Sequence, residues 1–177
     1  EPDLVPTGET EQSASGLLEI WPPFDAETDP IDRVFLPRAD IATPVLRCDG
    51  RAVAGFLNDR RHGRVGGTTA VFGDQGRALY FSKEVIPYTG RDYAPDEPTP
   101  VFHHVGVYAY RPAALAQYPS WPVGPLETLE GLEQLRFLEQ GRPVLCVEVD
   151  ANGRQFWELN NPSDVAIIEA MLAATTG

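Results

Sequence analysis

Two groups of residues have the types and the spacing to form a polar binding site. His104 and Tyr108 lie in an apolar run rich in β-branched and aromatic residues, with Gly106 between them. In a strand, residues two positions apart share one face, so these three would lie together. Gly106 would leave room for a ligand to approach, although a glycine in a strand equally marks a bulge. Glu133 and Gln134 lie at the edge of a leucine-rich helix, where a solvated acidic face is the default interpretation.

The histidines and cysteines do not favour a metal site. His103 and His104 would point to opposite faces of a strand, so that one can be buried while the other is exposed. The only other histidine is His62, and the two cysteines, Cys48 and Cys146, have no metal-type spacing. We expect the cysteines to be buried free thiols in a reducing compartment.

The glycine-rich segment Gly63–Gly67 has two interpretations. Glycines beside a basic residue can bind phosphate through backbone N–H groups. The segment contains neither a P-loop nor a dinucleotide-binding spacing, however, and we expect a turn in front of a hairpin. No nucleophile–base pair or pair of catalytic carboxylates stands out, so the residues alone predict an α/β domain with a polar site.

The elements that position these residues alternate between strands and helices in the second half of the chain. We therefore expect an α/β sandwich with a mixed, mainly parallel sheet between helices and an inserted antiparallel hairpin. The expected elements are strands at 41–46, 68–72, 77–82, 104–110 and 143–149, and helices at 51–61, 126–138 and 165–173.

Two segments are expected to be irregular. Residues 1–39 are rich in proline, with a short helix expected at 14–20, and residues 89–100 form an acidic loop that could act as a lid. The expected organisation is therefore an irregular segment over 1–39 and one α/β domain over 40–177.

The composition limits the partners. The chain has 177 residues, 42% apolar and 23% charged, and a formal net charge of −12. Such a surface argues against nucleic acid or an anionic membrane as a partner, but it does not exclude an anionic small molecule. No spanning segment or signal peptide is visible, so we expect a cytoplasmic protein.

A succession of short motifs carries a family resemblance. Residues 40–173 resemble the 3-deoxy-manno-octulosonate cytidylyltransferases, or CMP-Kdo synthetases. The motifs, in order, are Ala78–Lys83, Ile86–Tyr88, His104–Arg111, Leu132–Arg136 with Gly141, and Asn160–Asp164.

The resemblance implies a fold, an activity and a site. The fold would be of the nucleotide-diphosphosugar transferase type. The activity would be transfer of CMP from CTP to a Kdo-like eight-carbon sugar acid, with release of pyrophosphate, Mg²⁺ as cofactor and a homodimer as the assembly, for lipopolysaccharide synthesis. His104, Tyr108, Glu133 and Gln134 would contact the sugar acid, and Asn160 would stand at a metal-binding position.

The chain also departs from the family pattern. It shows neither the Arg/Ser/Lys-rich loop that holds the CTP phosphates nor the Gly-Asp-x-Pro motif, and Asn160 replaces an aspartate, which brings no charge to a metal. We therefore expect the N-terminal nucleotide-binding part to be missing. The chain would be a fragment, an enzyme completed by another chain, or a dead relative. The alternatives are a non-catalytic sugar-acid-binding or dimerisation module, and a structural domain in which His104 and Glu133 satisfy one another.

Overall fold

One six-stranded sheet organises the computed structural model, which describes residues 39–151, 156–157, 159, 162 and 164–175. Strand β1 is central because it pairs with β4 and β5 and also with β6, whereas β2 joins β4 to β3. The strands are β1 (Ile41–Asp49), β2 (Thr69–Phe72), β3 (Ala78–Ser82), β4 (Pro98–His104), β5 (Ala109–Tyr110) and β6 (Val144–Glu148).

The sheet is mixed but mostly antiparallel, so the prediction of a mainly parallel sheet is wrong. Among the named strands of the described chain, β1 and β6 form the parallel pair, and the other pairings are antiparallel. An apolar run predicts a strand but not its direction, which depends on the connection that follows it. The mixed α/β class itself is confirmed, as is the β2–β3 hairpin, whose turn places Gln75 and Gly76 at positive φ.

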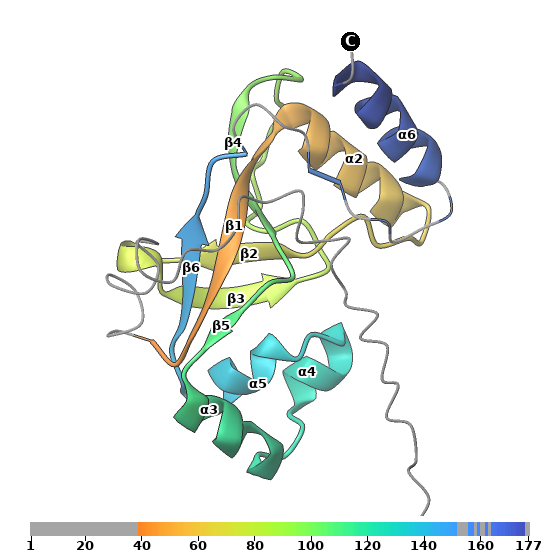
Figure 1. Ribbon diagram of the computed structural model, residues 1–177. Helices are drawn as coiled ribbons and strands as arrows, with labels where there is room; N and C mark the ends of the chain where they lie inside the picture. Colours follow the sequence, from red (N-terminus) through yellow and green to blue (C-terminus); the bar gives the residue numbers. More distant parts are fainter. Residues whose placement is uncertain (1–38, 152–155, 158, 160–161, 163, 176–177) are drawn as a thin grey trace, which may run out of the picture.

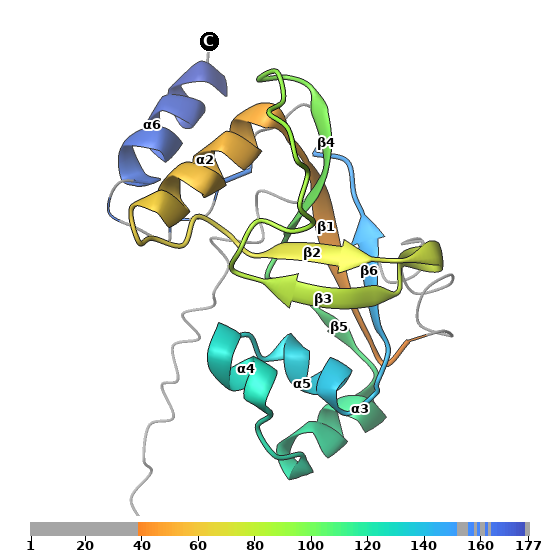
Figure 2. The ribbon, with the colours of Figure 1, turned by 180° about the vertical axis from the view of Figure 1, so that it is seen from behind.

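The helices form two groups at opposite ends of the sheet. Figures 1 and 2 show α2 and α6 side by side at one end, and α3, α4 and α5 together at the other. None of the described helices is long and apolar enough to cross a membrane. The helical elements are α2 (Gly50–Arg61), the 3₁₀ turn η2 (Asp74–Gly76), α3 (Pro112–Gln117), the 3₁₀ turn η3 (Tyr118–Ser120), α4 (Pro125–Glu130), α5 (Gln134–Glu139) and α6 (Asp164–Thr175).

Two predicted elements are interrupted in the structure. The helix expected over 126–138 is divided into α4 and α5 at Gly131, which has φ 61° and donates its N–H to Glu127 O at 2.7 Å. A left-handed glycine is a common helix terminator, and the leucine periodicity continues across it. The strand expected over 104–110 is likewise divided, because residues 105–108 form a turn between β4 and β5.

A single apolar cluster joins α5 to the sheet. Phe81 of β3, Leu135 and Phe137 of α5, and Val144 of β6 are all fully buried in it, together with Ile41 of β1. Burial of each such side chain stabilises the fold by about 1.5–3 kcal/mol. The α4–α5 segment is thus fixed against the end of β3.

The loop expected as a lid packs against α2 instead of standing free. Gly50 N donates to Glu97 O at 3.0 Å, and Arg51 N donates to Pro95 O at 2.9 Å. A side chain at Gly50 would collide with the carbonyl of Ala94, so glycine is required for this close approach. The backbone N–H groups at the start of α2 are therefore satisfied by the loop, and its role as a lid stays a prediction.

Candidate functional site

His104 is buried at the end of β4, on the side of the sheet that carries α5. Its backbone N–H donates to Thr68 O at 2.8 Å, and its Nε2 lies 3.0 Å from Thr43 Oγ1 on β1. The imidazole makes edge contacts with Phe81, at 5.1 Å between ring centroids. His104 is only 4% exposed, so its position is set by the core and not by solvent.

His103 contacts a different set of rings, as expected for neighbouring strand residues. Its imidazole packs edge-on against Phe56 of α2 at 4.9 Å and against Phe156 at 5.0 Å. Both histidines are buried, because His103 is also 4% exposed. Helix α2 covers its side of the sheet, so both imidazoles are enclosed.

Tyr108 is brought beside His104 by the turn rather than by strand alternation. The two ring centroids are 5.4 Å apart, and Tyr108 in turn lies 5.7 Å from Tyr110 of β5. Tyr110 continues the series to Phe137 of α5, at 5.9 Å. A chain of aromatic contacts therefore runs from the end of β4 to α5.

Glu133 and Gln134 lie at the start of α5. Glu133 is exposed, and its backbone carbonyl accepts from Tyr118 Oη at 3.4 Å. Burial, with a smaller contribution from the Glu133 charge, raises the pKa of Tyr110, which relates Glu133 to the aromatic chain. Tyr108 thus contacts both His104 and Tyr110, whereas Glu133 acts on Tyr110 through its charge.

Gln134 is the unusual member of the predicted set. Its side chain is 4% exposed, and its Nε2 has no hydrogen-bond partner among the residues that the structure describes. Leaving a buried amide N–H unsatisfied costs about 1–3 kcal/mol. A ligand acceptor at this position would remove that cost.

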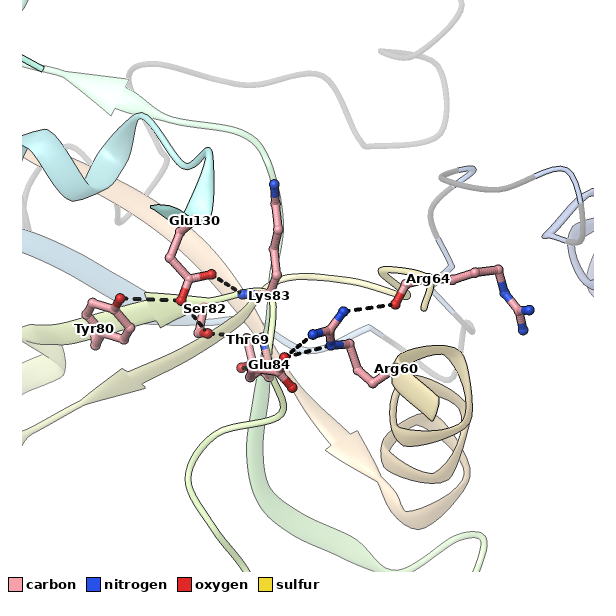
Figure 3. A network of polar contacts seen from close by, with 8 residues as sticks. All are labelled: Arg60, Arg64, Thr69, Tyr80, Ser82, Lys83, Glu84 and Glu130. Carbon is pink, nitrogen blue, oxygen red and sulfur yellow. Dashed lines mark hydrogen bonds and ion pairs between the residues drawn. The ribbon is translucent and has the colours of Figure 1, made fainter. Parts of the chain in front are cut away.

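A carboxylate and a lysine that the sequence analysis did not assign lie at the same junction (Figure 3). Glu130, the last residue of α4, accepts hydrogen bonds from Tyr80 Oη at 3.3 Å, Ser82 Oγ at 2.7 Å and the backbone N–H of Lys83 at 2.9 Å. The Nζ of Lys83 lies 3.0 Å from the position that a Cβ on Gly131 would take. An ammonium group therefore lies at the α4–α5 junction.

Lys83 had a visible signal in the sequence. It is the single lysine among 14 basic residues, and it falls inside the Ala78–Lys83 motif. Lysine is a compact, strongly hydrated point charge suited to a carboxylate or phosphate. Its relation to Glu130 could not be predicted, because the two residues come from different elements.

Helix α2 is fixed to the end of β3 by a second polar contact. Arg60 donates from Nε to Glu84 Oε1 at 2.9 Å, and its Nη2 makes a further short contact with the same oxygen. The hydrogen bond from Arg60 lowers the pKa of Glu84 below its usual value. Arg60 also donates to Arg64 O at 3.4 Å, so the segment after α2 belongs to the same network (Figure 3).

The Gly63–Gly67 segment is explained by close packing. A Cβ on Gly66 would lie 2.7 Å from Asp59 Oδ2, and one on Gly67 would lie 2.7 Å from His103 Nε2 and 3.0 Å from two ring carbons of Phe56. Such distances leave no space for any side chain. The structure supports the turn interpretation, in which glycine lets the chain pass over α2 into β2.

The chain is similar in sequence to cytidylyltransferases. Residues 66–148 match the family model described as "Cytidylyltransferase". A 3-deoxy-manno-octulosonate cytidylyltransferase of Maricaulis maris (strain MCS10) is 38% identical over 138 residues, which cover 78% of this chain and 52% of the relative. The enzyme of that name from Chlamydia trachomatis serovar L2 is 37% identical over 138 residues, covering 77% of this chain and 48% of the relative.

A solved structure agrees with these sequence relatives. It is described as the structure of CMP:2-keto-3-deoxy-manno-octonic acid synthetase complexed with CTP, and it has a TM-score of 0.58 and 26% identity over 82% of this chain and 53% of that chain. The chain is a homologue of the 3-deoxy-manno-octulosonate cytidylyltransferases. It spans about half the length of the relatives that match it over 138 residues.

In this cytidylyltransferase homologue, the matched range 66–148 contains the sugar-site candidates His104, Tyr108, Glu133 and Gln134, and also Lys83. Asn160, the predicted metal-binding residue, lies outside the described residues. Within the part of the chain that is described, no group of three or more His, Cys, Asp or Glu side chains could hold a metal ion. The Mg²⁺ site therefore stays a prediction.

Proposed function

We propose that this chain supplies the sugar-acid-binding part of a CMP-Kdo synthetase. The complete reaction would transfer CMP from CTP to an eight-carbon 3-deoxy sugar acid and release pyrophosphate, for lipopolysaccharide synthesis in the cytoplasm. The names of the relatives support this assignment. The chain spans about half the length of these relatives, so the complete reaction is proposed for the whole enzyme.

The observation that carries the proposal is the junction between α4 and α5. The buried Nε2 of Gln134, which lacks a partner among the described residues, belongs to the start of α5, and the ammonium of Lys83 lies near Gly131 at the end of α4. A sugar acid offers both complementary groups, a carboxylate for the lysine and hydroxyl oxygens for the amide. A purely structural role for Gln134 would leave its desolvation cost uncompensated.

Each residue has a distinct proposed task. Lys83 would bind the sugar carboxylate. Gln134 would donate a hydrogen bond to a sugar hydroxyl, and Glu133 would accept one from a sugar hydroxyl. Tyr108 would orient the sugar beside His104. Fixing the sugar in this way would bring its anomeric hydroxyl into line with the α-phosphate of CTP, so that positioning contributes much of the rate enhancement. Mg²⁺, when bound, would neutralise charge on the phosphates, and Asn160 would be the residue of this chain that binds it.

Isothermal titration tests the proposal. We expect the chain to bind 3-deoxy-manno-octulosonate, and we expect Gln134→Leu to abolish most of this binding without unfolding the protein. CTP with Mg²⁺ is titrated separately, because a non-catalytic module would bind the sugar acid alone. Absence of sugar-acid binding to the wild-type chain would refute the proposal. The expected homodimer is tested by sedimentation in the same buffer.

A further inference from the structure

Glu130 fixes the end of β3 to the end of α4 through three hydrogen bonds. Its Oε1 accepts from Tyr80 Oη and Ser82 Oγ, and its Oε2 accepts from the backbone N–H of Lys83. The Ser82 hydroxyl in turn accepts from the backbone N–H of Glu84 at 3.0 Å. The Ser82 hydroxyl has one proton, which it donates to Glu130, and it accepts the Glu84 N–H through a lone pair. Every donor in the network is therefore assigned.

A carboxylate suits this place better than any other side chain. All three partners of Glu130 donate, and an ionised carboxylate offers acceptors only, on two oxygens. A glutamine of the same size would turn an NH₂ group toward either the hydroxyls or the backbone N–H of Lys83. At least one of the three hydrogen bonds would then be lost.

The arrangement leaves the lysine ammonium available to an anion. The charge of Glu130 is compensated by three hydrogen bonds (Figure 3). The Nζ of Lys83 forms none of them and lies 3.0 Å from the position that a Cβ on Gly131 would take. Gly131 has φ 61°, so glycine favours both the helix end and the close approach of the ammonium. Lys83 is therefore anchored through its backbone N–H, and its ammonium lies close to the backbone of Gly131.

We propose that Glu130 is a positioning residue that holds the Lys83 ammonium at the α4–α5 junction to receive the carboxylate of the sugar acid. This inference rests on the proposed function. It makes a prediction opposite to that of simple electrostatics. Removal of a negative charge beside Lys83 would strengthen the binding of an anion if Glu130 acted only through its charge. If Glu130 acts by positioning Lys83, its removal instead weakens the binding of the anion.

A double-mutant cycle with 3-deoxy-manno-octulosonate as the titrated ligand separates these possibilities. Glu130→Gln is expected to weaken binding about fivefold to tenfold, and Lys83→Met to weaken it about tenfold or more. In the Lys83→Met background, Glu130→Gln should have no further effect, because its role acts through the lysine. Tighter binding by Glu130→Gln, or additive losses in the double variant, would overturn the inference.

Glu139→Gln is the matched control. Glu139 also accepts backbone N–H groups at α4, from Leu126 at 2.9 Å and Glu127 at 3.1 Å, but at the opposite end of the helix from Lys83. Its effect on binding should be independent of Lys83, so its double variant with Lys83→Met should be additive. Ser82→Ala, which removes one donor to Glu130, provides a milder variant if Glu130→Gln does not fold.

The single lysine also allows a test that needs no ligand. Reductive methylation with ¹³C-formaldehyde labels Lys83 and the terminal amine, and the latter serves as internal reference. We expect the Lys83 methyl resonance to shift and sharpen in Glu130→Gln, as the side chain becomes mobile, and to be unchanged in Glu139→Gln. An identical Lys83 resonance in Glu130→Gln and wild type would overturn the positioning role. If the wild-type chain binds no sugar acid, the proposed function fails while this measurement still decides the role of Glu130.

Discussion

The hydrogen bonds of the Thr43 hydroxyl determine the tautomer of His104. The Thr43 hydroxyl donates to the carbonyls of Val105 at 3.1 Å and Val107 at 2.8 Å, and it lies 3.0 Å from His104 Nε2. Because its one proton is directed to acceptor-only carbonyls, the oxygen acts as the acceptor toward the imidazole. Nε2 of His104 therefore carries a proton, and in the neutral ring Nδ1 is the acceptor. The same hydroxyl holds the turn that brings Tyr108 to His104.

Replacing Thr43 by valine should reduce both stability and ligand binding. The change keeps the shape of the side chain but removes the acceptor of His104 Nε2 and the donor to two carbonyls. We expect a loss of about 1–3 kcal/mol in the free energy of unfolding, measured by urea denaturation, and weaker sugar-acid binding. Thr43→Ser keeps the hydroxyl and should lose only about 0.8 kcal/mol for the missing methyl group. Equal losses of affinity in the two variants would contradict the assignment.

Gln134→Met should stabilise the fold while weakening sugar-acid binding. Methionine fills a similar volume and removes an amide that has no partner at Nε2 among the described residues, so the free energy of unfolding should rise by up to about 1–3 kcal/mol. The opposite changes of stability and affinity are measured by thermal unfolding and calorimetry. Gln140→Met, at the exposed end of α5, should change neither. A marked loss of stability in Gln134→Met would show that the amide is already satisfied.

The sequence predicts the elements of this fold better than their arrangement. The apolar runs that become β1, β2, β3 and β6 are visible in the sequence, and so is the turn between β2 and β3. The direction of β4 and β5 is not, because it follows from the turn over residues 105–108 and from hydrogen bonds to Thr43, which lies about 60 positions away. The break at Gly131 interrupts no apolar periodicity, so the leucine pattern alone conceals it.

The candidate site shows the same division. Motifs indicate His104, Tyr108, Glu133 and Gln134, whereas the end of β4 is linked to α5 through rings that no pattern connects, such as Tyr110 and Phe137. Glu130 carries no signal in the sequence beyond that of a solvated helix residue. Its importance follows only from the approach of α4 to β3, which tertiary packing determines.

Gly67→Ala should destabilise the protein more than Gly106→Ala. A Cβ at position 67 would meet His103 and Phe56 at 2.7–3.0 Å, whereas one at position 106 has no atom within 4 Å. Overpacking of this kind costs about 1–3 kcal/mol, so the urea midpoint of Gly67→Ala should fall clearly below that of Gly106→Ala. A phosphate-binding role for the segment predicts another outcome, in which Gly67→Ala folds normally and loses affinity for inorganic phosphate.

The two cysteines should be unreactive in the folded protein. Burial raises the pKa of the Cys48 and Cys146 thiols to about 12 each, so almost no thiolate is present at pH 8. Both side chains are buried and neither forms a disulfide. Ellman's reagent should therefore titrate no thiol in the native protein. It should titrate two thiols in about 6 M guanidinium chloride, which unfolds the chain fully. Rapid reaction of either thiol in buffer would contradict its burial.

The Glu127–Arg136 ion pair should determine how the free energy of unfolding declines at acidic pH. Arg136 donates from Nε and Nη2 to the two carboxylate oxygens of Glu127, at 2.6 Å each, between α5 and α4. These hydrogen bonds lower the pKa of Glu127 below 4.5, so the stabilisation is fully present above about pH 4.5 and is lost as the pH falls through the folded-state pKa. Glu127→Gln should therefore reduce the free energy of unfolding at pH 7 by about 1.5–3 kcal/mol and flatten its decline below pH 4.5.

Glu148→Gln provides the comparison for this ion pair. Glu148 forms a two-point contact with Arg47, but the two side chains are 45% and 42% exposed, against 8% and 13% for Glu127 and Arg136. An exposed pair contributes only about 0–1 kcal/mol, so its removal should leave the pH profile close to that of the wild type. If both variants gave the same profile, burial would not be what makes the Glu127 contact strong, and the α4–α5 segment would owe its place to the apolar cluster alone.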